Sequence, residues 1–72
     1  MNMLPLHIFI LRELRKNNGT LTDKELYRIV RKIYNENLSF SQFNKMLMTL
    51  EIRGKIIVEP LKRNLRIIRL AR

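Results

Sequence analysis

Hydrogen-bonding side chains recur at helical spacing in the segment between Ser39 and Gly54. The outer stripe of a helix there consists of Ser41, Asn44, Lys45 and Met48, flanked by Gln42 and Thr49. Carboxamides can pair with the edge of adenine, an ammonium group suits guanine or phosphate, and hydroxyl groups suit phosphate. Gln42 is also placed to cap the helix, which would occupy its amide. This stripe suits contacts with a nucleic acid, and the alternative for each residue is a solvated surface position.

Positive charge is concentrated in the last third of the chain. Residues 53 to 72 contain seven Lys and Arg against Glu59 alone, and the whole chain has a formal charge of +9. The loop predicted there and the residues beside it supply the candidate contacts Lys62, Arg63, Asn64 and Arg66. A positive loop tip can meet a phosphate or enter a narrow minor groove. Solubility charge is the alternative, but clustering with Lys55, Arg69 and Arg72 favours a surface that binds polyanions.

Residues suited to catalysis or metal binding are sparse. His7 is the single histidine and lies on an apolar helical face, and the chain has no cysteine. The sequence shows neither a plausible carboxylate pair nor a nucleophile with its base. We therefore expect a protein that is not an enzyme, with no metal, cofactor or small-molecule ligand. The absence of cysteine agrees with a reducing compartment, and we expect a cytoplasmic protein.

The apolar start of the chain, from Met3 to Leu11, is too short to span a membrane. It covers about half of the roughly 20 residues that a helix needs to cross a bilayer, and it contains Pro5. We therefore expect no membrane association.

Three helices and a hairpin are predicted to position these groups. Hydrophobic periodicity and turn residues predict helices over about residues 4–16, 22–35 and 39–53, with Pro5 in the first turn of the first helix. β-Branched residues predict a C-terminal hairpin with strands over about 56–60 and 65–70, and Pro60 ends the first of them. Thr20 and Leu21 suit a third, very short strand. Residues 1–72 are then a single α+β domain, as the chain length indicates.

Two helix starts carry the same capping pattern. Thr22 and Glu25 match a capping box, and so do Ser39 and Gln42. About four residues separate the second and third predicted helices, which is typical of a helix-turn-helix motif. Gly54 is expected to close the third helix in a left-handed conformation. The predicted buried faces consist of Leu26, Ile29, Val30 and Ile33 in the second helix and Phe43, Met46, Leu47 and Leu50 in the third.

The first predicted helix is apolar on nearly every side. One face is formed by His7, Ile10, Leu11 and Leu14. Leu6, Ile8 and Phe9 fall on other faces, and a domain this small cannot bury all of them against itself. These three residues are therefore predicted to form a homodimer interface. The alternative is that the helix packs against the hairpin.

The order of helix, short strand, two helices and hairpin resembles the winged-helix branch of the helix-turn-helix proteins over nearly the whole chain. The segment FNKMLMTLEIRGKI, from Phe43 to Ile56, is similar to the recognition helix of that family and the entry to its wing. The resemblance implies a winged helix with its third helix in the major groove of double-stranded DNA and its wing loop on the backbone or minor groove. The expected function is a DNA-binding protein, a small transcriptional regulator that acts as a homodimer on a near-palindromic site.

Two other functions remain open. Met48 and Ile52 project from the face of the third helix that would meet DNA, and exposed apolar residues there suit a winged-helix protein–protein interaction module within a larger assembly. Met48 can instead contact a thymine methyl group. RNA is the other alternative, although the five aromatic residues do not form an obvious stacking platform.

Overall fold

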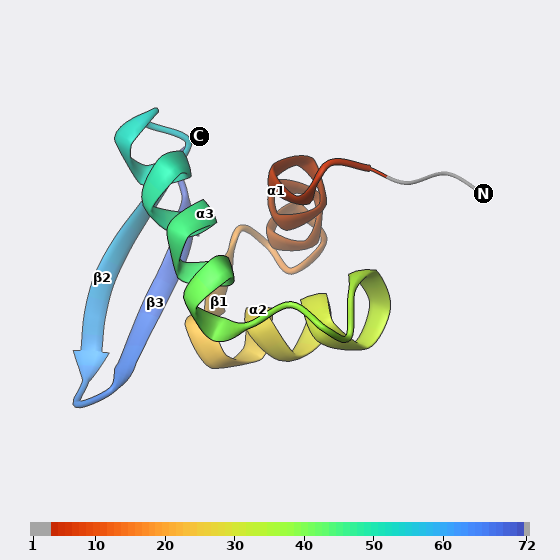
Figure 1. The fold of residues 1–72 in the computed structure, drawn as a ribbon. Coiled ribbons are helices and arrows are strands. Elements are labelled where there is room, and N and C mark those ends of the chain that lie inside the picture. Colours follow the sequence, from red (N-terminus) through yellow and green to blue (C-terminus); the bar gives the residue numbers. More distant parts are fainter. Residues whose placement is uncertain (1–3, 72) are drawn as a thin grey trace.

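The chain folds into three helical segments and one small sheet. The computed structural model describes residues 4–71, so Met3 and Arg72 lie outside the described residues. In chain order the elements are α1 (Leu6–Lys16), β1 (Thr20–Thr22), α2 (Asp23–Ile29), η1 (Val30–Tyr34), α3 (Phe40–Ile52), β2 (Ile56–Lys62) and β3 (Leu65–Leu70) (Figure 1). The π-helical turn η1 continues α2 without a break, so the two form one second helix. The predicted α+β class is confirmed.

The sheet is antiparallel, with the strand order β1-β3-β2. β3 lies in the centre, where Ile68 pairs with Leu21 of β1 on one side and with Val58 of β2 on the other. β1 confirms the predicted third strand. β2 and β3 form the C-terminal hairpin, whose turn projects beyond the start of α3 (Figure 1).

The first strand of the hairpin is two residues longer than predicted. β2 continues through Pro60 to Lys62, and Pro60 pairs with Arg66 inside the ladder. Proline is tolerated because β2 is an edge strand, and an irregularity in the register between Pro60 and Lys62 accommodates it. The turn is then Arg63–Asn64, with Asn64 in the left-handed region at φ 60°.

Both predicted capping boxes are formed. The Thr22 hydroxyl accepts a hydrogen bond from the N–H of Glu25 at 3.1 Å, and the Ser39 hydroxyl accepts one from the N–H of Gln42 at 3.0 Å. Each cap satisfies a backbone donor that the first turn of its helix would leave unpaired. Gly54 follows the end of α3 at φ 75°, as predicted for a left-handed cap.

α1 begins at Leu6, two residues later than predicted. Pro5 is the N-cap residue, with a ψ of 150°, and its carbonyl accepts the first helical hydrogen bond from Phe9 N–H at 3.0 Å. A residue that precedes proline is disfavoured in the helical region, which keeps Leu4 out of the helix. Pro5 therefore flanks the first turn and is not part of it.

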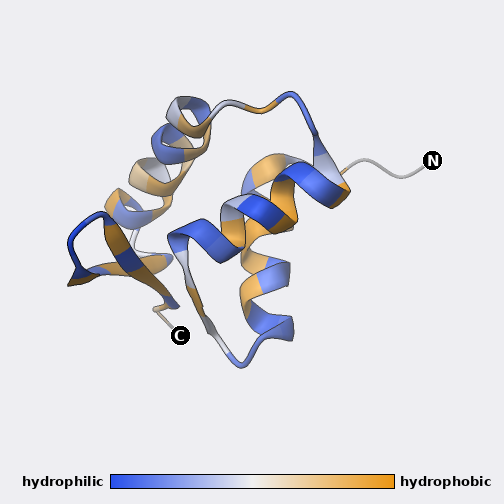
Figure 2. Ribbon diagram, turned by 90° about the horizontal axis from the view of Figure 1, so that it is seen from below, coloured by the Kyte–Doolittle hydropathy of each residue, from blue (hydrophilic) through white to orange (hydrophobic). Residues whose placement is uncertain are grey.

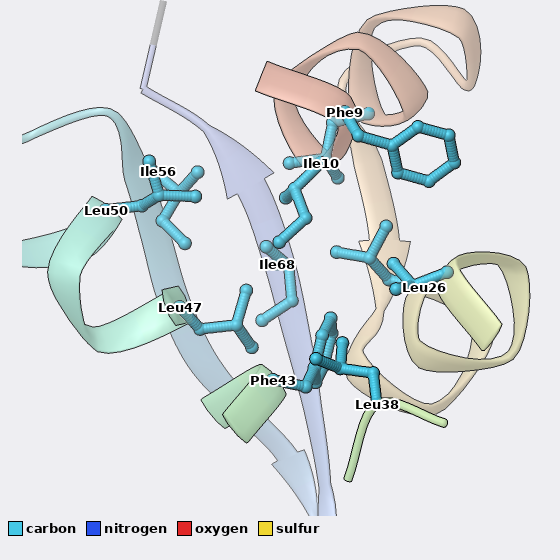
Figure 3. Packing of buried hydrophobic residues seen from close by; sticks show 11 residues of the cluster. Phe9, Ile10, Leu26, Leu38, Phe43, Leu47, Leu50, Ile56 and Ile68 are labelled. Carbon is cyan, nitrogen blue, oxygen red and sulfur yellow. The ribbon is translucent and has the colours of Figure 1, made fainter. Parts of the chain in front are cut away.

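The core lies between the helices and the inner face of the sheet. Its buried residues are Phe9, Ile10, Leu14, Leu26, Val30, Leu38, Phe43, Leu47, Leu50, Ile56 and Ile68. Figure 3 shows Ile68 of the central strand among residues of all three helices. Hydropathy follows this arrangement, because the hydrophilic sides of the helices face outward (Figure 2). The predicted inner face of α3 is confirmed, with Met46 half-buried beside the core.

The turn η1 moves one predicted core residue to the surface. Ile33 is 62% exposed, whereas Tyr34 packs against the core, with its ring centre 5.0 Å from that of Phe9. The Tyr34 hydroxyl donates to the Leu4 carbonyl at 2.6 Å. In this wider turn the N–H of Asn35 bonds to a carbonyl five residues earlier. The buried face of the second helix is therefore shifted by about one residue toward the C-terminus. The assignment of Ile33 to the buried face is therefore wrong.

α1 buries more of its surface within the domain than the sequence predicts. Phe9 is 3% exposed and belongs to the core, so it has no surface to offer a second chain while this fold is kept. Leu6 is half-buried against the same core, and Ile8 is 40% exposed. α1 lies against β3 and β1 as well as the other helices, which accounts for most of its apolar surface.

Candidate nucleic-acid interface

The predicted outer stripe of α3 lies mainly at the surface, on the side of the helix away from the core. Its exposed members are Ser41, Gln42, Lys45, Met48 and Thr49, and Asn44 is half-buried. Lys45 is exposed, and within residues 4–71 its ammonium group takes part in no ion pair. Its charge is therefore available to a ligand.

Two members of this stripe are engaged within α3 itself. Oε1 of Gln42 accepts a hydrogen bond from the N–H of Ser39 at 2.9 Å, which completes the capping box. The hydroxyl of Thr49 donates to the carbonyl of Lys45 at 3.1 Å. Gln42 thus offers a ligand chiefly the nitrogen of its amide, as its capping role implies.

Arg66 of β3 connects α3 to the start of α2. Its Nε donates to Oδ2 of Asp23 at 2.9 Å, and its Nη2 donates to Oδ1 of Asn44 at 2.5 Å. The backbone N–H of Arg66 also donates to Oδ1 of Asp23 at 3.2 Å. We call this set the Asp23–Arg66–Asn44 bridge. It fixes the hairpin against the start of α2 and against α3.

Asp23 is only 2% exposed, yet the bridge favours the charged form of its carboxyl group. Burial by itself raises the pKa of the carboxyl group. The side-chain and backbone hydrogen bonds from Arg66 and the charges of Lys24 and Arg66 together lower this pKa by more than burial raises it, so the pKa lies below its usual value. Removal of Arg66 would leave a buried carboxylate without its main partner. Arg66 therefore stabilises the charged form of the buried Asp23.

The bridge engages two of the predicted contact residues, Asn44 and Arg66. The Arg66 side chain is 36% exposed, and both its Nε and its Nη2 are used. A paired hydrogen bond with adenine needs both the oxygen and the nitrogen of an Asn amide, and Oδ1 of Asn44 already accepts from Arg66. Asn44 therefore offers a ligand chiefly its Nδ2 donors.

Lys24 ties the hairpin turn to the second helix. Its Nζ donates to the carbonyl of Asn64 at 2.8 Å and lies 5.0 Å from the centre of the Phe40 ring, at the start of α3. Lys62 and Arg63, the two residues before Asn64, are exposed. The basic turn is thus held beside the first turn of α3.

An open cleft of about 600 Å³ lies between the hairpin and the start of α3. We call it the hairpin cleft. Its lining includes the predicted contact residues Asn44, Lys62, Asn64 and Arg66, together with Asp23, Lys24 and Phe40. The structure thus brings four predicted contacts from two separate segments into one place.

The sequence pattern does not single out Asp23 or Lys24 as site residues. An acidic residue just after a helix cap is common, because it interacts favourably with the helix dipole. The signal for Asp23 would have been its partner, but Arg66 lies 43 residues away along the chain. Only the tertiary structure supplies that pairing.

Not every basic residue of the hairpin lines the hairpin cleft. Arg69 pairs with Glu59 of β2, and both side chains are about half exposed. Successive residues of a strand point to opposite faces, so Arg69 lies on the face opposite to Arg66 and the buried Ile68. The charge of Arg69 therefore lies on the outer face of the sheet and not in the hairpin cleft.

Two apolar residues on α3 are exposed, as predicted. Met48 is 59% exposed and Ile52 is 78% exposed. They lie one turn apart on the same side of the helix. The exposed stripe of α3 is therefore polar near its start and apolar near its C-terminal end.

The described part of the chain offers no evident metal site. Residues 4–71 contain no group of three or more His, Cys, Asp or Glu side chains that could hold a metal ion. None of the helices in this range has the length and apolar character needed to cross a membrane.

Comparison with protein-family models, with curated proteins and with solved structures found no match to this chain. Its function has to follow from the arrangement of its own residues.

Proposed function

We propose that this chain is a winged helix that binds double-stranded DNA and acts as a small transcriptional regulator. α3 enters the major groove with its exposed stripe, and the hairpin, as the wing, contacts the backbone or the minor groove. One observation carries this proposal: residues of α3 and of the basic hairpin turn line the same cleft. A ligand that meets the start of α3 also meets the turn.

Fixed geometry supports the same function. The Asp23–Arg66–Asn44 bridge and the bond from Lys24 to Asn64 hold the turn in place before any ligand arrives. A surface that is ordered in advance loses less conformational entropy on binding. The charge of +9 supplies the long-range attraction to phosphates, which makes the affinity fall steeply with salt.

The proposal includes a homodimer that uses what remains exposed of α1. Ile8 is 40% exposed, and Leu6 lies half-buried two residues before it. A two-fold contact through the exposed part of α1 around Ile8 would present two recognition helices to successive major grooves.

A protein–protein interaction module is the second candidate function. The exposed pair Met48 and Ile52 favours it, since apolar side chains on the outer face of α3 suit a protein partner. A salt-insensitive complex with a protein partner, abolished by Met48→Asp or Ile52→Asp, would support this function over DNA binding.

The test of the proposed function is an NMR titration of the full chain, labelled with nitrogen-15, with a random DNA duplex of about 30 base pairs, long enough for two half-sites one helical turn apart. We expect the largest changes at the amides from Ser41 to Thr49 and at Arg63 and Asn64. Amides of Asn17 and Asn18, in the turn after α1, are the internal reference. Unchanged spectra at low salt, or changes limited to α1, would contradict the proposal.

A further inference from the structure

A second cleft lies on the outer side of the second helix. It has a volume of about 340 Å³ and is lined by Lys24, Tyr27, Arg28, Arg31, Lys32 and Glu36. We call it the helix-2 cleft. Four of its six lining residues are cations and one is an acid, so the hollow attracts anions.

Arg31 is held in place within this cleft. Its Nε and Nη2 donate to the carbonyl of Glu36 at 3.1 and 3.0 Å, and its guanidinium lies 5.7 Å from the centre of the Tyr27 ring. Tyr27 is itself fixed, because its hydroxyl donates to the carbonyl of Leu38 at 2.8 Å. A guanidinium that is ordered in advance loses less side-chain entropy when it meets a phosphate.

The aromatic wall of the cleft is not open for base stacking. The Tyr27 ring packs edge-on against Phe40, with 5.0 Å between the ring centres, and Arg31 lies over it. Proteins that hold single-stranded nucleic acid stack its bases on open aromatic faces. The helix-2 cleft therefore suits a phosphate group and not a base.

Lys24 joins the two clefts. It lines both the hairpin cleft and the helix-2 cleft, and its Nζ reaches the hairpin turn. A basic path thus runs from the hairpin turn, past the start of α3, to Arg28 and Lys32. A DNA strand carries a phosphate at every nucleotide and can follow such a path without a break.

We propose that the helix-2 cleft binds a backbone phosphate of the same duplex, beside the phosphates that the hairpin contacts. This inference rests on the proposed function and extends its contact surface to the second helix. Arg31 provides the ordered guanidinium, and the exposed Arg28 and Lys32 add charge around it.

The test compares two variants that each remove two positive charges. Arg28→Ala/Arg31→Ala removes charge from the helix-2 cleft, including the ordered guanidinium, and Arg12→Ala/Arg15→Ala removes it from α1, which packs against the buried side of α3. Fluorescence anisotropy with a random duplex gives the slope of log affinity against log salt. We expect the first variant to make that slope shallower by about 0.9, the change for one phosphate that is no longer neutralised, and the control to leave it unchanged.

Lysine acetylation read by mass spectrometry locates the contact independently. We expect the duplex to protect Lys32 and to leave Lys16 on α1 as reactive as in the free protein. Equal slopes for the two variants, or a Lys32 that the duplex does not protect, would overturn the inference.

The outcomes also separate this inference from the proposed function. If the wild-type chain binds DNA and Lys62→Ala/Arg63→Ala weakens its salt dependence while Arg28→Ala/Arg31→Ala does not, only the helix-2 cleft is refuted. If the wild-type chain binds no duplex at low salt, both fail.

Discussion

Arg66 donates a hydrogen bond from Nη2 to Oδ1 of Asn44 at 2.5 Å, and so joins the hairpin to α3. The same guanidinium binds the buried Asp23. In the proposed DNA complex Arg66 is therefore a positioning residue, which sets the distance between the wing and α3. The bond also leaves Asn44 with its Nδ2 donors to offer, so the remaining exposed stripe has a larger share in reading bases.

Loss of the Arg66 side chain should destabilise the fold. We expect Arg66→Ala to lower the free energy of unfolding by about 2 kcal/mol, because a hydrogen-bonded, buried carboxylate loses its charged donor. Arg69→Ala is the matched control, since it removes the same side chain from the same strand but breaks only a half-exposed ion pair with Glu59. The control should lose less than about 1 kcal/mol. Urea denaturation measures both, and equal losses would contradict a structural role for the bridge.

The bridge also predicts how stability depends on pH. The folded pKa of Asp23 lies below its usual value, so the carboxylate stabilises the native state above the unfolded pKa, and this contribution is lost as the pH falls through the folded pKa. We expect wild type to be more stable than Asp23→Asn at neutral pH and the difference to shrink below about pH 4. Urea denaturation across this pH range checks it. A difference that stays constant with pH would contradict the account.

Two serines near the start of α3 should have separable roles. Ser39 caps the helix through its hydroxyl, so Ser39→Ala should cost about 1 kcal/mol of stability. Ser41 is exposed within the helix, so Ser41→Ala should change stability by less than about 0.5 kcal/mol and weaken DNA binding. Thermal denaturation measures the change in stability, and fluorescence anisotropy with the random duplex measures the change in DNA binding. The opposite pattern would show that the stripe is misassigned.

The proposed dimer depends on the exposed part of α1. We expect sedimentation velocity to show a dimer for wild type and a monomer for Ile8→Glu, because a charge in that contact would be buried without a partner. Ile57→Glu is the control, since Ile57 is also exposed, at 44%, but lies on the sheet. A wild-type chain that stays monomeric, or a dimer that Ile8→Glu leaves intact, would refute the α1 interface.

The local parts of the fold were readable from the sequence. The capping pairs of Thr22 with Glu25 and of Ser39 with Gln42 depend on residues three apart, and both are formed as predicted. The end of α3 shortly before Gly54 follows from the conformational freedom of that glycine. Boundaries were less accurate at the two prolines: α1 begins only after Pro5, and β2 continues past Pro60.

The remaining features depend on tertiary packing. The π-helical turn has no simple signature in the residues from Val30 to Tyr34, yet it exchanges Ile33 for Tyr34 at the core. The candidate site was predicted as two separate sets on α3 and the hairpin. The link between them passes through Asp23 and Lys24, whose partners lie 43 and 40 residues away in sequence. Spacing along the chain does not reveal such pairs.

Salt-dependent binding to a random duplex tests the proposed DNA binding most directly. Fluorescence anisotropy would compare wild type, Lys62→Ala/Arg63→Ala and the α1 control Arg12→Ala/Arg15→Ala from low to moderate salt. We expect tight wild-type binding with a steep negative salt slope, which the hairpin variant makes shallower by about 0.9 for each phosphate that it no longer neutralises and the control leaves unchanged. Absence of binding at low salt, or equal slopes for all three proteins, would contradict a role of the hairpin as a DNA-binding wing.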